Sequence, residues 1–166
     1  MNQDQDVARG GVEQQAPNQV DSMLLPLTGV QLLIPNLCVA EIVSSAVLAR
    51  REAPSEDWIL GDLDWRGTKV PLIAFEVACG RSVLPIQGLV RHAAVLYSIA
   101  RPDNLKYLAV LTQGLPRIAR VQEDSIAVLP NAFESCPFVQ AGVAVNNLQA
   151  VIPDLGALER AVVASA

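Results

Sequence analysis

The side chains with the greatest potential for catalysis are Cys79 and His92. Cys79 stands directly before Gly80 at a predicted turn, and His92 is the only histidine of the chain. A thiol at a turn with a histidine as its base would form a nucleophilic pair. The sequence around Cys79 resembles no nucleophile motif, however, and His92 begins an apolar run, where a structural histidine is the more ordinary role. A small cysteine-dependent enzyme therefore remains only as an alternative.

The remaining reactive side chains show no recognisable metal or cofactor pattern. Cys38, Cys79 and Cys136 are odd in number and widely spaced, so we expect three buried structural thiols and no disulfide framework. Asp62 and Asp64 share a face of an extended segment, but a metal site would need further ligands nearby. The sequence also contains no glycine loop for phosphate and no dinucleotide fingerprint. We therefore predict no metal site, no cofactor and no enzymatic activity.

Binding chemistry is concentrated in residues 58–76, which contain both tryptophans of the chain. Each half of this segment has the form of a strand, and the turn between them contains Trp65, Arg66 and Gly67. Gly67 can adopt a positive φ without steric cost, which suits a tight turn. Trp65 and Arg66 are then presented at a surface, and tryptophan and arginine dominate binding hot spots. The alternative is a hairpin corner at which Trp65 packs onto the core.

The elements that would position this turn are short. Apolar runs bounded by turn residues predict strands at about 23–27, 30–34, 46–50, 92–99, 105–112, 115–121, 139–145 and 148–152, besides the two in 58–76. We expect short helices over 37–43 and 77–80, and a terminal helix that begins after 153. Residues 1–21 are polar and are predicted to be a disordered tail, which leaves 22–166 as the folded domain. Nine or ten short strands favour an antiparallel barrel or sandwich.

Composition excludes several classes of partner. The chain is 51% apolar and only 17% charged, and its net charge of −5 is not accompanied by a cluster of basic residues. Nucleic acid is therefore not an expected partner, because phosphate binding needs clustered Lys and Arg. No apolar run is long enough to span a bilayer, and the first residues do not resemble a secretory signal. We expect a cytoplasmic protein without direct membrane insertion.

Three segments in order resemble CheW-like domains. Residues 61–73, GDLDWRGTKVPLI, resemble the family signature of a glycine, a short strand, an LRG-type turn and a VP strand. Residues 39–42, VAEI, resemble the early V-x-E-I motif, and residues 107–121 resemble the paired strands of the second half. The resemblance covers residues 22–163.

This resemblance implies a mainly β fold of two small, five-stranded, SH3-like barrels packed over a shared apolar core, with short helices. It also implies a non-catalytic adaptor. The expected partners are the cytoplasmic tip of a methyl-accepting chemoreceptor and the regulatory domain of a CheA-type histidine kinase. The partner-binding positions that carry over, together with their neighbours in the motifs, are Val39, Glu41, Ile42, Gly61, Trp65, Arg66 and Gly67.

The chain departs from the family pattern at several positions. Asp64 and Trp65 replace a small polar residue and a leucine, Ala74 replaces an acidic residue, and Glu76 replaces a basic one. Such divergence is compatible with an accessory adaptor of a chemosensory system that controls type IV pili and twitching motility. A β-barrel interaction module with an unrelated partner is the other alternative, since a fold does not determine a function.

Overall fold

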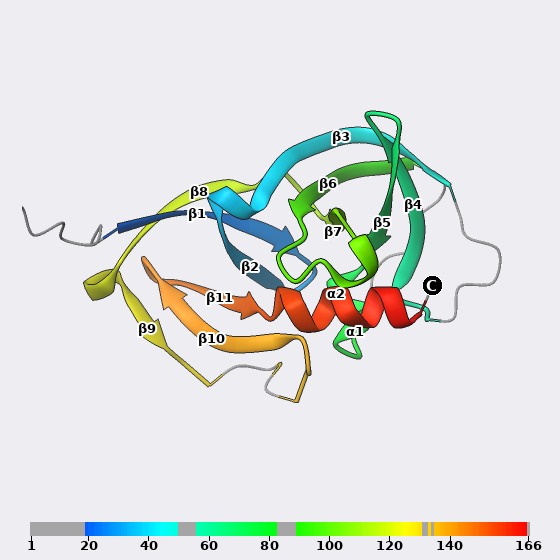
Figure 1. Ribbon diagram of the computed structural model, residues 1–166. Helices are drawn as coiled ribbons and strands as arrows, with labels where there is room; N and C mark the ends of the chain where they lie inside the picture. Colours follow the sequence, from blue (N-terminus) through cyan, green and yellow to red (C-terminus); the bar gives the residue numbers. More distant parts are fainter. Residues whose placement is uncertain (1–18, 50–55, 83–88, 131–132, 134, 166) are drawn as a thin grey trace, which may run out of the picture.

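The protein consists of two curled β-sheets with few and short helices (Figure 1). The computed structural model describes residues 19–49, 56–82, 89–130, 133 and 135–165. One sheet has six strands in the order β8-β1-β2-β11-β10-β9, and the other is a closed barrel in the order β3-β4-β5-β7-β6. The predicted mainly β fold of two small units with short helices is therefore confirmed: one unit is a closed five-stranded barrel and the other is a curled six-stranded sheet.

The six-stranded sheet is assembled from the two ends of the chain. Its strands are β1 (Gln19–Leu27), β2 (Val30–Pro35), β8 (Arg117–Gln122), β9 (Ile126–Val128), β10 (Val139–Val145) and β11 (Leu148–Pro153). All pairings are antiparallel except that of β11 with β2. Tight turns join the hairpins β1–β2 and β10–β11, where Gly29, Asn146 and Asn147 all have positive φ. This sheet therefore brackets the barrel in sequence.

The barrel uses the middle of the chain. Its strands are β3 (Val39–Ala49), β4 (Ile59–Trp65), β5 (Thr68–Ile73), β6 (Leu89–Tyr97) and β7 (Tyr107–Thr112). Strand β7 is buried on both faces, as its unbroken apolar run predicts. Leu108 and Val110 face the core shared with the six-stranded sheet, whereas Ala109 and Leu111 face the barrel interior.

Three expectations about local structure are wrong in part. The predicted helix over 37–43 is a short 3₁₀ helix at Asn36–Cys38 followed by strand β3, because cross-strand pairing of Glu41 with Val95 and Ile42 with Ala94 replaces the helical i, i+4 contacts. The predicted strand at 46–50 is the second half of β3, as far as it is described. The predicted start of the folded domain at residue 22 is too late, because Gln19–Asp21 pair with β8; residues 1–18 lie outside the described part of the chain.

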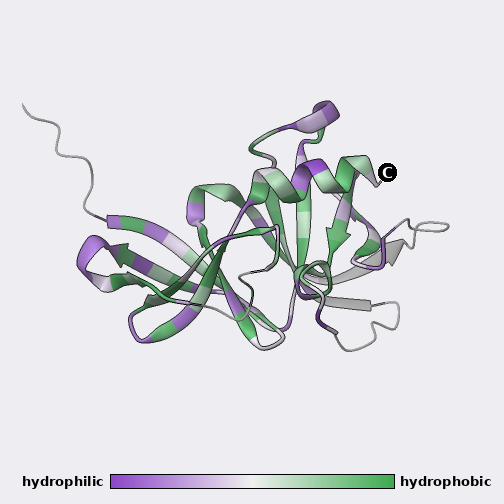
Figure 2. Ribbon diagram, turned by 90° about the horizontal axis from the view of Figure 1, so that it is seen from below, coloured by the Kyte–Doolittle hydropathy of each residue, from purple (hydrophilic) through white to green (hydrophobic). Residues whose placement is uncertain are grey.

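A shared apolar core joins the two units. It contains Leu25 and Ile34 from the six-stranded sheet, Phe75 and Leu96 from the barrel unit, and Leu158 from helix α2 (Leu155–Ala164). Helix α2 follows β11 and extends toward the barrel (Figure 1). Figure 2 shows that α2 is mainly hydrophobic with one hydrophilic interruption. The predicted terminal helix, with Leu155, Leu158 and Val162 on its buried face, is confirmed.

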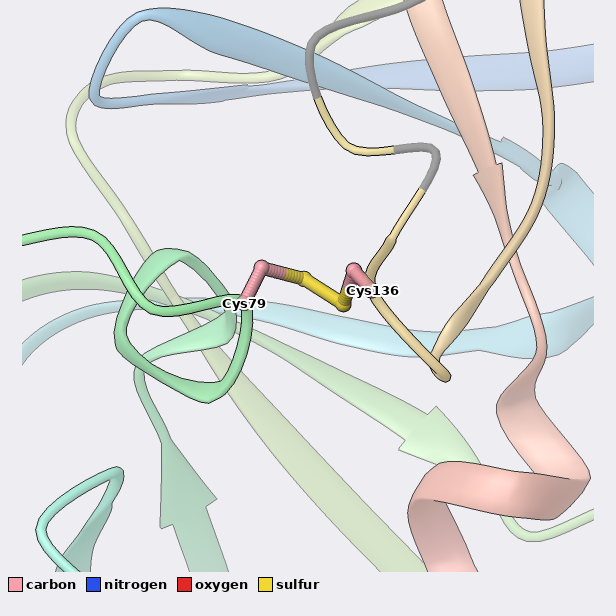
Figure 3. The surroundings of a disulfide bond; sticks show 2 residues. All are labelled: Cys79 and Cys136. Carbon is pink, nitrogen blue, oxygen red and sulfur yellow. A yellow bond between two sulfur atoms is a disulfide. The ribbon is translucent and has the colours of Figure 1, made fainter.

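A disulfide bond also joins the two units (Figure 3). Cys79 follows helix α1 (Phe75–Ala78), which comes after barrel strand β5, and Cys136 precedes β10 of the six-stranded sheet. Their Cα atoms are 5.0 Å apart although they are separated by 57 residues in sequence. The expectation of three structural thiols is therefore wrong for these two, because the fold brings distant segments together in a way that cysteine spacing does not reveal. Cys38 is the free thiol.

Candidate functional site

One end of the barrel gathers residues from five strands. The first residues of β3, β5 and β7 meet the last residues of β4 and β6 there, because Trp65 pairs with Thr68 and Tyr97 pairs with Tyr107. The β4–β5 turn, which sequence analysis singled out for binding, lies at this end of the barrel.

The β4–β5 turn has the backbone of a tight hairpin. Arg66 and Gly67 are its two central residues, with φ of 52° and 73°. Two-residue hairpins of this kind require positive φ at both central positions, and a side chain at such a position costs roughly 1 kcal/mol or more. Gly67 meets this requirement freely, whereas Arg66 meets it under strain. The predicted turn is confirmed. Because backbone strain is common at functional sites, the exposed Arg66 side chain is a candidate for binding.

Trp65 and Arg66 converge on one carboxylate. Oε2 of Glu41 accepts a hydrogen bond from Nε1 of Trp65 at 2.9 Å and another from Nη2 of Arg66 at 2.8 Å. The Arg66 guanidinium also lies over the Trp65 ring, with Cζ 5.0 Å from its centroid. We call Glu41, Trp65 and Arg66 the Arg66 cluster. It joins two motifs that are 24 residues apart in sequence.

The Arg66 cluster is open to solvent. The Arg66 side chain is 71% exposed and that of Glu41 is 39% exposed, while Trp65 is half-buried against the barrel core. The expectation that Trp65 is partly accessible and lies beside Arg66 is confirmed. An exposed ion pair contributes only about 0–1 kcal/mol to stability. The cluster therefore serves mainly to orient the Arg66 guanidinium.

A row of aromatic rings extends from this cluster. The Trp65 ring is 4.8 Å from that of Tyr107, edge to face, and the Tyr107 ring is 5.8 Å from that of Tyr97. Tyr97 is 48% exposed. Sequence reasoning missed this row, although a signal was present. Tyr97 and Tyr107 are the only tyrosines of the chain, and they lie near the facing ends of the strands predicted at 92–99 and 105–112.

The other predicted binding residues are not part of the Arg66 cluster. Val39 and Ile42 are half-buried and pack against the core shared by the two units. Gly61 is buried within β4 at a register shift and has a φ of 144°. Of the seven positions the resemblance indicated, the structure thus brings together Glu41, Trp65, Arg66 and Gly67, and it gives Val39, Ile42 and Gly61 places in the strands beneath.

The catalytic alternative loses its nucleophile. The sulfur of Cys79 is bonded to Cys136, so Cys79 cannot supply a thiolate to a substrate. Nδ1 of His92 instead lies 3.4 Å from Oγ of Ser44 on the neighbouring strand. Within the described residues, no three His, Cys, Asp or Glu side chains are grouped to hold a metal ion. None of the described helices has the length and apolar character needed to cross a membrane.

Comparison with known proteins agrees with this geometry. The model of the family described as CheW-like domain matches residues 21–162. Among solved structures, the scaffolding protein TtCheW from Thermoanaerobacter tengcongensis is similar, with a TM-score of 0.65 and 15% sequence identity, over 81% of this chain and 88% of that chain. At this identity the likeness shows a shared fold alone. No curated protein sequence matches the chain significantly.

Proposed function

Because this chain belongs to the family of CheW-like domains, we propose that it is a non-catalytic adaptor that couples chemoreceptors to a CheA-type histidine kinase. In this role it binds the cytoplasmic tip of a methyl-accepting chemoreceptor and the regulatory domain of the kinase. Both partners place it in the cytoplasm. Neither interaction requires covalent chemistry from the adaptor, in keeping with a disulfide-bonded Cys79.

The geometry of the Arg66 cluster is the observation that carries this proposal. A guanidinium has a planar fork of N–H donors that suits carboxylates and the carbonyl groups at a helix end. Glu41 takes one side of that fork and holds it over the Trp65 ring. The side chain is then held in place and exposed before a partner arrives, which lowers the entropic cost of binding. The receptor tip docks on this cluster, with Gly67 supplying the turn beneath it.

The departures from the family pattern leave this surface in place. Ala74 and Glu76 are both fully buried. Glu76 accepts a hydrogen bond from the backbone N–H of Thr28 at 2.7 Å, and so fixes the β1–β2 turn against α1. These two departures therefore change the packing between the units, not the exposed surface. Asp64 is an exposed departure and Trp65 is a half-buried one. Both support an accessory adaptor such as those of type IV pilus systems that control twitching motility.

Titration of Arg66→Ala against the purified cytoplasmic fragment of a chemoreceptor from the same genome tests the proposal. Truncation of a hot-spot arginine costs about 2 kcal/mol or more, so the affinity should fall by about thirtyfold. The melting temperature should change little, because the side chain is exposed. Arg160→Ala removes an equally charged, exposed side chain from α2 and should bind normally.

Arg66→Lys separates charge from geometry, because lysine keeps the charge and loses the fork. The affinity of Arg66→Lys for the receptor should be lower than that of the unmodified chain. It should exceed the affinity of Arg66→Ala by no more than about tenfold. Unchanged affinity in both variants would contradict docking at this cluster. Binding of the chain to an unrelated protein, and not to the receptor, would support the alternative of an interaction module with another partner.

A further inference from the structure

A hollow lies beside the aromatic row at the barrel end. Its volume is about 300 Å³, and it is lined by Tyr97, Arg101, Asn104, Leu105, Lys106 and Tyr107. We call it the tyrosine hollow. Tyr107 belongs both to this lining and to the ring contact with Trp65, so the hollow is continuous with the Arg66 cluster. None of its features is used by the adaptor role described so far.

The β6–β7 loop that forms the hollow is strained. Arg101, Asp103 and Asn104 have φ values of 49°, 45° and 63°. The left-handed region is unfavourable for a residue with a side chain, and less so for Asp and Asn. Three such residues within four positions persist only where the surroundings hold them. Strain of this kind gathers at sites that clamp ligands, which makes the loop a candidate binding feature.

A buried carboxylate holds this loop in its strained form. Glu159 of α2 is only 1% exposed. Its side chain accepts hydrogen bonds from Oγ of Ser98 and from the backbone N–H groups of Ile99 and Ala100, each at 2.8 Å, and a longer one from the N–H of Arg101 at 3.3 Å. Hydrogen bonds to a carboxylate are stronger than those between neutral groups. These hydrogen bonds offset the backbone strain of the loop, so the hollow is present before any ligand binds.

The chemistry of the lining selects an acidic, partly apolar ligand. Arg101 and Lys106 are exposed cations at its rim, in a chain whose net charge is −5. Asp103 is the one acidic residue of the loop, and it does not line the hollow. The two tyrosine rings supply apolar area, and Ile99, two residues after Tyr97 in sequence, is 60% exposed. A ligand that complements both features has carboxylates next to apolar groups. A protein segment combines the two, whereas a small inorganic anion does not.

We propose that the tyrosine hollow binds an acidic segment of the docking partner. Carboxylates of this segment contact Arg101 and Lys106, and its apolar side chains pack on Tyr97 and Tyr107. The proposal rests on the proposed function in one respect, namely that the receptor bound at the Arg66 cluster supplies the segment. The aromatic row gives one partner a continuous surface from Arg66 to Lys106.

Charge reversal tests this inference with the full chain and the purified receptor fragment. Arg101→Glu and Lys106→Glu should each weaken binding by about tenfold, because an attraction to a carboxylate becomes a repulsion. This loss of affinity should become smaller as the salt concentration rises from about 0.05 to about 0.5 M, because salt screens interactions between exposed charges. Arg120→Glu on β8, whose side chain is also exposed, serves as the matched control and should bind normally.

A second measurement does not depend on the receptor. A synthetic peptide of alternating glutamate and leucine should shift the amide resonances of residues 97–107, and a lysine–leucine peptide of equal length should not. Lys106→Glu should abolish the shifts. Equal responses to both peptides, or none to either, would overturn the inference. If the two reversals bind the receptor like Arg120→Glu while Arg66→Ala is weak, the tyrosine hollow is excluded and the proposed function stands; if Arg66→Ala also binds normally, both fail.

Discussion

Reduction of the Cys79–Cys136 disulfide should destabilise the protein strongly. The bond closes a loop across 57 residues of sequence, and the chain-entropy relation gives about 4 kcal/mol at 25 °C for a loop of this length. It also links α1 to the segment before β10, and so holds the barrel against the six-stranded sheet. For a chain of this size, 1 kcal/mol shifts the melting temperature by about 2–4 °C. Reduction should therefore lower it by roughly 8–16 °C.

Thermal unfolding with and without a phosphine reductant measures this effect. The Cys79→Ala/Cys136→Ala double variant should melt at the temperature of the reduced protein and should not respond to the reductant. Cys38→Ala is the control, because Cys38 is the free thiol and its variant should respond fully. The reasoning is refuted if the reductant leaves the melting temperature of the unmodified chain within about 2 °C, or if it acts equally on the double variant.

The buried Glu159 and the half-buried Cys38 lead to two further predictions. Glu159→Gln should lower the free energy of unfolding by about 2 kcal/mol or more, because an amide N–H₂ would face backbone N–H donors whose hydrogen bonds the carboxylate accepts. Urea unfolding measures this change. The control Arg160→Ala, at an exposed position, should change the free energy of unfolding little. Burial, and then the Glu159 carboxylate, raise the pKa of the Cys38 thiol, so alkylation of Cys38 by iodoacetamide should become fast only at a higher pH than for an ordinary cysteine. An alkylation rate at pH 8 equal to that of a cysteine peptide would contradict this.

Local patterns predicted the turns and strands well because each depends on a few neighbouring residues. The Trp65-Arg66-Gly67 turn and the doubly buried β7 follow from a glycine and from an unbroken apolar run. The segment at 37–43 was misassigned, because apolar residues at i and i+4 fit a helix as well as a strand with a register shift. Only pairing with β6, some 50 residues away in sequence, decides between them.

The candidate site could be predicted only where a motif marked it. The family motifs indicated Glu41 and Arg66. The two hydrogen bonds that the Glu41 carboxylate accepts from Trp65 and Arg66, however, depend on closure of the barrel. Glu159 and the disulfide were missed because their partners lie 58 or more and 57 residues away. One signal for Glu159 was present: it shares the buried face of α2 with Leu155 and Val162, where a carboxylate must be hydrogen-bonded.

Adaptor-dependent capture of the receptor by the kinase tests the adaptor role most directly. The regulatory domain of a CheA-type kinase is immobilised, and the purified receptor fragment is passed over it with the unmodified chain, with Arg66→Ala or with no adaptor. We predict that the receptor is retained with the unmodified chain, that retention falls by an order of magnitude or more with Arg66→Ala, and that it is absent without adaptor. Receptor retention that is equal in all three conditions would contradict the account.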